Sequence, residues 1–143
     1  MSKLQIYMKT LIKKKTTINK KDNLIILCKK NSNLSQYNLS SKEQDFLKKE
    51  KGEIVTINQY NRYVFIVRPK ENNNLDFYNE NCRLIGDKLI EKLINIKSVI
   101  IIDTEMNSDD ILQVAEGMAL SNYTFNKYKK VQEKKLEKIF LIT

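Results

Sequence analysis

Leu24-Ile25-Ile26-Leu27-Cys28 is a run of five consecutive apolar residues, with Asp22 shortly before it and lysines directly after it. A strand that is covered on one face alternates apolar and polar residues, whereas a strand that is covered on both faces is apolar throughout. The run therefore predicts a strand over 24–29 in the interior of a sheet. A second run, Val99 to Ile102, is β-branched throughout and predicts another buried strand, which ends at Asp103.

Four further strands are expected outside this pair. They cover Leu4 to Met8, Glu53 to Asn58, Arg62 to Arg68 and Lys138 to Thr143. The middle two flank a turn that contains Gln59, Tyr60 and Asn61, which is the spacing of a hairpin. Alternate residues of the second hairpin strand are expected to point to opposite faces, with Tyr63, Phe65 and Val67 on one face and Val64 and Ile66 on the other.

Two helices are expected before residue 95. A short one over 41–49 follows Ser40-Ser41-Lys42-Glu43, which has the spacing of a capping box. Its Phe46 and Leu47 are expected to face inward. A longer helix from Leu75 to Ile94 carries an apolar stripe with steps of three and four residues, made of Tyr78, Cys82, Ile85, Leu89 and Leu93.

A third helix is predicted to begin at Ser108-Asp109-Asp110, with Ser108 as the cap and two acids beside the positive end of the helix dipole. Its apolar face would consist of Ile111, Val114, Ala115, Met118 and Ala119. The small Ala115 and Ala119 are four residues apart, so they would let the helix pack closely onto a sheet.

Strands that alternate with helices around buried runs predict an α/β fold with helices layered on a mixed sheet. The chain has 143 residues and is 41% apolar, which fits one compact domain over 1–143. No stretch approaches the roughly 18 to 20 consecutive apolar residues that span a bilayer, and the first residues lack the apolar part of a signal peptide. We therefore expect a soluble, cytoplasmic protein without a membrane partner.

The formal net charge is +9, which suits a polyanion partner because clustered cations release counterions from phosphate backbones. Arginine, which forks onto phosphates and base edges, occurs only at 62, 68 and 83, so most of the 26 basic residues are lysines. One lysine group, Lys13-Lys14-Lys15 with Lys20-Lys21, is predicted to lie in a loop or hairpin between strands. Another, within 127–138, is predicted to be an exposed linker or short helix. A solvated lysine surface is favoured, with weak, non-specific polyanion binding possible.

Residue types exclude several kinds of active site. The chain has no histidine, which excludes Ser-His-Asp and Cys-His triads and removes the commonest zinc ligand. Its three glycines form neither a P-loop nor a G-x-G-x-x-G motif. Cys28 and Cys82 lack the CxxC spacing and are expected to be reduced core residues. The carboxylates Asp103, Glu105, Asp109 and Asp110 cluster but match no EF-hand, so no catalytic, cofactor-binding or metal-binding residue is assigned.

The segment 115–129 reads AEGMALSNYTFNKYK. It resembles the segment that closes the N-terminal domain of leucyl (cytosol) aminopeptidases, where Ala-Glu-Gly and a few small or apolar residues precede Tyr-x-Phe-x-x-Tyr-Lys. The residues that carry the motif are Glu116, Gly117, Tyr123, Phe125, Tyr128 and Lys129. The resemblance extends to 58–65, which is similar to the family's hairpin, and to 98–103, which is similar to its central strand.

The resemblance implies a three-layer α/β/α sandwich similar to the macro domain. It also implies a non-catalytic role, since the family's catalytic domain, with two divalent metal ions (zinc or manganese), would follow this one in a homohexamer. The domain would help to organise that hexamer and would contact its own catalytic domain and sister subunits. The chain alone is expected to be inactive and monomeric.

The motif residues are expected to be structural rather than catalytic. The rings of Tyr123, Phe125 and Tyr128 would close the core at a helix end. Glu116 is not a metal ligand by this resemblance, because Val114 and Met118 stand where the family's dimetal motif has Asp and Arg. Two other classes stay open: a stand-alone macro-like module, for which the lack of a glycine-rich loop predicts weak ADP-ribose binding, and a basic nucleic-acid-binding domain.

Overall fold

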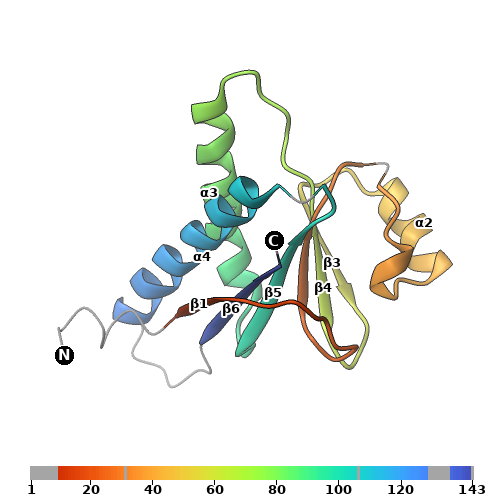
Figure 1. Ribbon diagram of the computed structural model, residues 1–143, viewed down its shortest axis with the longest axis horizontal. Coiled ribbons are helices and arrows are strands. Elements are labelled where there is room, and N and C mark those ends of the chain that lie inside the picture. The colour runs from red at the N-terminus through yellow and green to blue at the C-terminus, as the bar shows by residue number, and fades with distance from the viewer. Residues whose placement is uncertain (1–9, 31, 106, 129–135, 143) are drawn as a thin grey trace.

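The computed structural model describes residues 10–30, 32–105, 107–128 and 136–142. Within them, six strands form one sheet, accompanied by three α-helices and one 3-10 helix (Figure 1). In chain order the elements are β1 (Leu11–Lys14), β2 (Leu24–Leu27), η1 (Ser35–Tyr37), α2 (Ser41–Lys49), β3 (Ile54–Asn58), β4 (Tyr63–Val67), α3 (Leu75–Lys92), β5 (Ser98–Asp103), α4 (Ser108–Tyr128) and β6 (Lys138–Ile142).

The strands lie in the order β1-β6-β5-β2-β4-β3. Neighbouring strands are parallel except β3 and β4, which form the predicted antiparallel hairpin. β2 lies between β5 and β4, and none of its four side chains is more than 2% exposed. The prediction of an interior strand from the apolar run is therefore confirmed, as is the mixed sheet.

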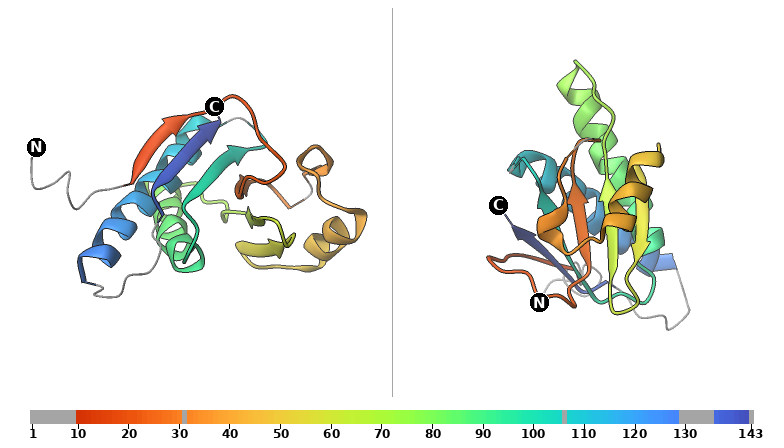
Figure 2. Two further views of the ribbon diagram at one scale, coloured as in Figure 1. Left: turned by 90° about the horizontal axis from the view of Figure 1, so that it is seen from below. Right: turned by 90° about the vertical axis from the view of Figure 1, so that its right-hand side faces the viewer.

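Two apolar clusters fill the two faces of the sheet. Ile25, Phe65 and Val67 belong to the cluster beneath α3 and α4, together with Cys82, Ile85 and Leu89 of the predicted helix stripe. Val64 and Ile66 belong to the other cluster, together with Leu47 of α2. The predicted alternation along β4 is thus confirmed. Figures 1 and 2 show α3 and α4 side by side on one face and α2 on the other, which is the α/β sandwich expected.

The second face has two different covers. α2 and η1 lie over the side of β4 and β3, where Leu34, Leu39 and Leu47 are buried. The segment 15–23 crosses in front of β6 and β5 on its way from β1 to β2 (Figure 1). Its first residue, Lys15, places Nζ 5.0 Å from the centre of the Phe140 ring of β6. A cation above the ring and an extended segment therefore cover the part of this face that α2 does not reach.

The two long helices touch through glycines. A Cβ atom on Gly117 of α4 would collide with the backbone carbonyl of Arg83 in α3, and would lie 2.9 Å from the Arg83 Cα. A Cβ atom on Gly86 of α3 would collide with the carbonyl of Val114 and would lie 2.8 Å from the amide nitrogen of Met118. The sequence predicts close packing of α4 through Ala115 and Ala119. Ala115 is fully buried, Ala119 is only half-buried, and the closest backbone approach is to the other helix rather than to the sheet.

Local sequence explains where most helices begin. The capping box of α2 forms as predicted: the Ser40 hydroxyl accepts from the Glu43 amide at 3.1 Å, and the Ser40 amide donates to the Glu43 carboxylate at 2.9 Å. For α4 the predicted cap is one residue off. Asn107, not Ser108, accepts the amides of Asp109 and Asp110, because Asn caps as well as Ser and Ser108 is already helical.

Two other predictions need correction. Phe46 of α2 is 45% exposed, because the short helix contacts the core along one narrow line that Leu47 occupies.

Lys13 and Lys14 lie in β1 rather than in a loop. The Leu11 amide donates to the Glu137 carbonyl and the Lys15 amide donates to the Leu141 carbonyl, so pairing with β6 forms the strand. All four β1 side chains are exposed, and lysines are common on such an edge. The strand expected over 4–8 and most of the 127–138 lysine group lie outside the described residues.

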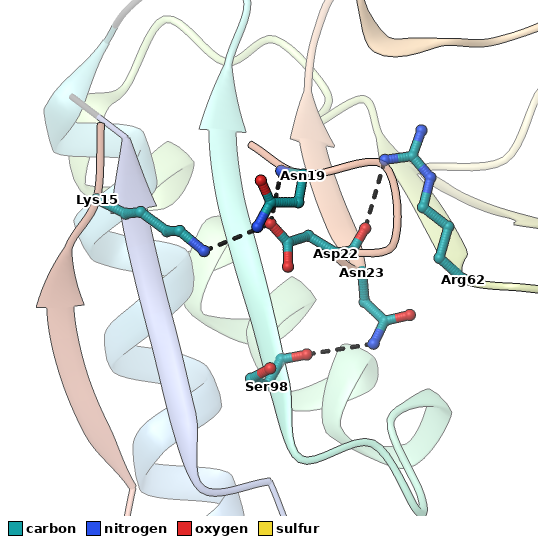
Figure 3. A network of polar contacts seen from close by, with 6 residues as sticks. All are labelled: Lys15, Asn19, Asp22, Asn23, Arg62 and Ser98. Carbon is teal, nitrogen blue, oxygen red and sulfur yellow. Dashed lines mark hydrogen bonds and ion pairs between the residues drawn. The ribbon is translucent and has the colours of Figure 1, made fainter. Parts of the chain in front are cut away.

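A polar network holds the amino ends of the central strands (Figure 3). The Asp22 carboxylate accepts from the Asn19 amide at 2.8 Å and from Lys15 Nζ at 3.4 Å. The Asn23 side chain bridges two strands, donating to the Ser98 carbonyl and accepting from the Tyr63 amide. Arg62 is 3% exposed and donates to the Tyr37 carbonyl and the Gln59 side chain, each at 2.6 Å, and to the Asp22 carbonyl at 3.4 Å. The polar side chains at the amino ends of the central strands therefore have hydrogen-bond partners within the chain.

None of the helices in the described ranges is long and apolar enough to cross a membrane.

Replacing Gly117 by Ala is expected to destabilise the protein by about 1 to 3 kcal/mol, since the new methyl group meets backbone atoms that cannot move aside. The direction is informative, because the same change in a free helix would stabilise it by about 1 kcal/mol. Urea unfolding monitored by circular dichroism would measure it. Gly52→Ala is the matched control, because its Cβ would come no closer than 3.6 Å to a neighbouring atom. Equal stability of Gly117→Ala and the parent would contradict the packing described.

Candidate functional site

A cavity of about 470 Å³ opens where the three central parallel strands end. The strand ends are aligned by hydrogen bonds: the Cys28 amide donates to the Val67 carbonyl, and the Thr104 amide donates to the Leu27 carbonyl. The residues that follow β2, β4 and β5 therefore lie at one edge of the sheet. In open α/β sheets the carboxyl ends of the strands are the usual place for ligands. The cavity size is also in the range of small-molecule sites.

Asp103 ends β5 and lines this cavity, although the residue is only 5% exposed. Within the described chain, its carboxylate has a single hydrogen bond, accepted by Oδ1 from the Glu105 amide at 2.8 Å. Burial raises the pKa of Asp103 above its ordinary value, and the nearby Asp110 carboxylate adds to the rise. The floor of the cavity thus contains a carboxylate that its own chain stabilises poorly.

Asp110 and Tyr78 contribute a second polar group to the cavity. The Tyr78 hydroxyl, on the first turn of α3, donates to Asp110 Oδ2 at 2.9 Å on the first turn of α4. Burial raises the pKa of Asp110, and the hydrogen bond from Tyr78 partly offsets it. Burial and the same hydrogen bond raise the pKa of Tyr78. The hydroxyl is therefore a donor and not a base.

Charged side chains of both signs line the rest of the cavity: the cations are Lys29, Lys30, Lys51, Lys70 and Arg68, and the further carboxylates are Glu50, Glu53, Glu71 and Glu105. Lys29 Nζ lies 3.4 Å from the Glu105 carboxylate, and both side chains are largely exposed. Arg68 donates to the carbonyls of Leu47 and Glu50 at 2.9 and 2.8 Å, but none of the described carboxylates pairs with it. The guanidinium therefore holds the loop after α2 through backbone carbonyls rather than through an ion pair.

The two cysteines do not supply a nucleophile. Both are free and buried, as predicted. Burial raises the pKa of Cys28 to about 11 and that of Cys82 to about 11. A thiol with such a pKa is almost fully protonated at neutral pH, so neither residue has the thiolate that attacks substrates or binds metals.

The carboxylates that cluster in the sequence separate in space. Asp103, Glu105 and Asp110 line the cavity, whereas Asp109 is exposed and does not. Among the described residues no group of three or more His, Cys, Asp or Glu side chains is placed to hold a metal ion. Sequence reasoning missed Arg68, Tyr78 and Lys29. The signal that could have found two of them is position, since Lys29 and Arg68 closely follow buried parallel strands.

The family-motif residues lie away from this cavity. Glu116 is exposed, and its carboxylate is 3.8 Å from Arg83 Nε, on the side of α4 where Gly117 meets α3. Tyr123, Phe125 and Tyr128 belong to the last two turns of α4, and their side chains lie outside what the structure describes. Lys129 also lies outside the described residues. Their expected role in closing the core stays a prediction.

Replacing Asp103 by Asn is expected to stabilise the protein relative to the parent at neutral pH but not at low pH. The raised folded-state pKa of Asp103 means that folding favours its protonated form, so this carboxyl stabilises the fold below its unfolded pKa of about 3.9. That contribution is lost as the pH rises through the folded pKa. An asparagine side chain would keep the acceptor for the Glu105 amide without the buried charge.

Unfolding free energies of the parent and Asp103→Asn at pH 4 and pH 7 would measure this difference. The exposed Asp87→Asn on α3 is the control, and it should show no comparable change between the two pH values. A stability difference between parent and Asp103→Asn that is independent of pH would contradict the burial of an ionisable carboxyl.

Comparison with known proteins supports the fold. No family model matches the sequence, and no curated protein matches it. Among solved structures, a mutant of tomato leucine aminopeptidase aligns with a TM-score of 0.60 and 12% sequence identity, over 94% of this chain and 32% of that one. The chain therefore spans about a third of the length of that aminopeptidase. At this identity the likeness establishes a shared fold over nearly the whole chain.

Proposed function

We propose that this chain is the non-catalytic N-terminal domain of a leucyl aminopeptidase-like metallopeptidase. The observation that carries the proposal is the structural likeness to tomato leucine aminopeptidase, which covers 94% of this chain and only 32% of the other. Such unequal coverage is expected when one domain is compared with a larger enzyme that contains a similar domain. The motif in 115–129 supports the same family from the sequence, independently of the fold.

The chemistry of the described residues agrees with a supporting role. Hydrolysis of a peptide by a dimetal enzyme needs ligands that hold two metal ions and polarise the scissile carbonyl. The chain has no histidine, and among the described residues no three His, Cys, Asp or Glu side chains are grouped so that they could hold a metal ion. The peptidase reaction would therefore take place in a separate domain that carries the zinc or manganese ions.

In this proposal the domain helps to organise a cytoplasmic homohexamer. Its partners are its own catalytic domain and sister subunits, and the domain alone is a monomer. The net charge of +9 allows weak binding to polyanions in addition, through counterion release. Such binding would fall steeply with salt and would not discriminate between sequences.

One observation favours a second candidate, a stand-alone binding module of the macro-like class. The cavity at the carboxyl ends of β2, β4 and β5 lies where open α/β sheets bind small molecules. The two candidates differ in the gene sequence downstream of Thr143. A reading frame that continues into a dimetal motif supports the peptidase, whereas a natural stop codon supports the module.

The 143-residue chain is expected to release no chromophore from leucine p-nitroanilide, with zinc or with manganese present, because its described residues lack a ligand set for two metals. The same chain joined to its downstream reading frame should be active, and a chelator should abolish that activity. Sedimentation should show a monomer for the short protein and a hexamer for the extended one. Chelator-sensitive hydrolysis by the purified 143-residue chain would refute the non-catalytic assignment.

A further inference from the structure

The outermost strand on one side of the sheet, β3, has a free backbone edge. It is the last strand in the sheet order, and in the described chain only β4 pairs with it (Figure 1). The backbone groups of Glu53 and Gln59 bond toward β4. Because successive residues of a strand point their backbone groups to opposite sides, those of Ile54, Thr56 and Asn58 point away from the sheet. None of the described backbone hydrogen bonds uses them.

The two edge strands of the sheet differ in how they are protected against pairing. Natural proteins protect a free edge with lysines, prolines or bulges. The β1 edge carries Lys13 and Lys14. The β3 edge reads Ile-Val-Thr-Ile-Asn over 54–58, without a charge or a proline, and its register with β4 is continuous, so it has no bulge. In a chain with 26 basic residues, this uncharged edge is the one suited to the addition of another strand.

We propose that β3 pairs antiparallel with β3 of a second copy of this chain, across a twofold axis at Thr56, so that the two sheets join into one. The hydrogen-bonding pattern limits the register, because outward residues can pair only with outward residues. The register centred on Thr56 is the one that pairs all three of them. It sets Thr56 opposite Thr56 and Ile54 opposite Asn58 of the second copy, and each of these pairs exchanges two hydrogen bonds.

The side chains fit this register. Val55 lies opposite Ile57 of the second copy, so an apolar pair forms on the face that α2 covers. The two Thr56 side chains are exposed in the single chain and form a Thr–Thr pair, which is a stabilising cross-strand combination. Just outside the strand, Glu53 lies opposite Gln59 of the second copy. No two like charges therefore face each other along the pairing.

The β1 edge offers no comparable register. The amides of Leu11 and Lys15 bond to β6, so the outward residues of β1 are Ile12 and Lys14. An antiparallel pairing that uses both of them sets Lys13 directly opposite Lys13 of the second copy. Like charges in that position destabilise a sheet, so self-pairing is assigned to β3 alone.

The contact is weak between two free copies. Five residues a side is far below the roughly 20 to 30 residues a side of a stable interface. The isolated chain is therefore a monomer at micromolar concentration and pairs near millimolar concentration. Effective concentrations of that size arise when copies are tethered in one assembly. Use of the contact within a homohexamer rests on the proposed function, whereas the contact itself needs only this chain.

Disulfide trapping of the 143-residue chain tests the register. The Cα atoms of the two Thr56 residues would be about 5.5 Å apart, which a disulfide can bridge. Asn58→Cys is the matched control on the same edge, because its two copies would be about 14 Å apart along the strands. At about 1 mM protein under mild oxidation, Thr56→Cys should form a linked dimer at least about tenfold faster than Asn58→Cys. The native Cys28 and Cys82 are buried and do not compete.

Amide NMR spectra of the parent, recorded from about 0.05 to about 1 mM, test the hydrogen bonds. The amides of Ile54, Thr56 and Asn58 should shift with concentration and exchange more slowly with solvent. Thr56→Lys sets two like charges against each other at the axis and should abolish both effects, whereas Thr56→Val should keep them. Position 56 is exposed, so both variants are expected to fold, and thermal melts check this.

Three results would overturn the proposal. They are equal cross-linking rates for the two cysteine variants, no concentration dependence of these amides in the parent, and an unchanged concentration dependence in Thr56→Lys. None of these outcomes depends on peptidase activity or on a hexamer, so they leave the domain assignment to its own test.

Discussion

The contact between α3 and α4 at Gly86 and Gly117 is the constraint on which the structure most depends. Because neither residue has a side chain, the two helix backbones touch, and they cover one face of the sheet as a single layer. The contact also sets the relative position of the first turns of both helices. Tyr78 and Asp110 therefore meet at 2.9 Å above the ends of the strands. A packing feature in the middle of two helices thus determines the shape of a cavity at their ends.

Elements that depend on a local pattern were predicted well from the sequence. Continuous apolarity located β2, the 3.6-residue stripe located α3, and the Ser40 and Glu43 pair located the start of α2. Where a prediction failed, the deciding partner was distant in the sequence. β1 is a strand because β6, more than a hundred residues later, pairs with it, and no pattern within Leu11–Lys14 shows this. Phe46 is exposed because of how a nine-residue helix sits on the sheet, which its own sequence does not specify.

The candidate site was less predictable, for a related reason. The cluster of carboxylates after β5 is visible in the sequence, but its members act differently: Asp103 is buried whereas Asp109 faces solvent. Arg68 and Tyr78 reach the cavity from β4 and α3, so their relation to Asp103 depends on parallel strands ending at one edge. Charge alone did not distinguish Arg68 from the many solvated lysines. The contacts of Arg68 in the structure distinguish it, because backbone carbonyls hold its guanidinium and no described carboxylate pairs with it.

The buried charges at the two ends of the parallel strands differ in how many hydrogen-bond partners they have. At the amino ends of the strands, Arg62 is almost fully buried and donates to three oxygens from three different segments, so the chain itself satisfies the charge. Figure 3 shows one of these bonds, to the Asp22 carbonyl. At the carboxyl edge, Asp103 is buried to a similar degree but has one hydrogen bond within the described chain. A buried charge with so few partners costs stability that the fold could recover with an amide at the same position. The cost is understandable if the missing donors come from outside the chain, since a group that binds a ligand cannot also be satisfied by its own protein. Well-satisfied polar groups therefore lie at the amino ends of the strands, and the carboxylate with few partners lies at their carboxyl ends, beside the cavity.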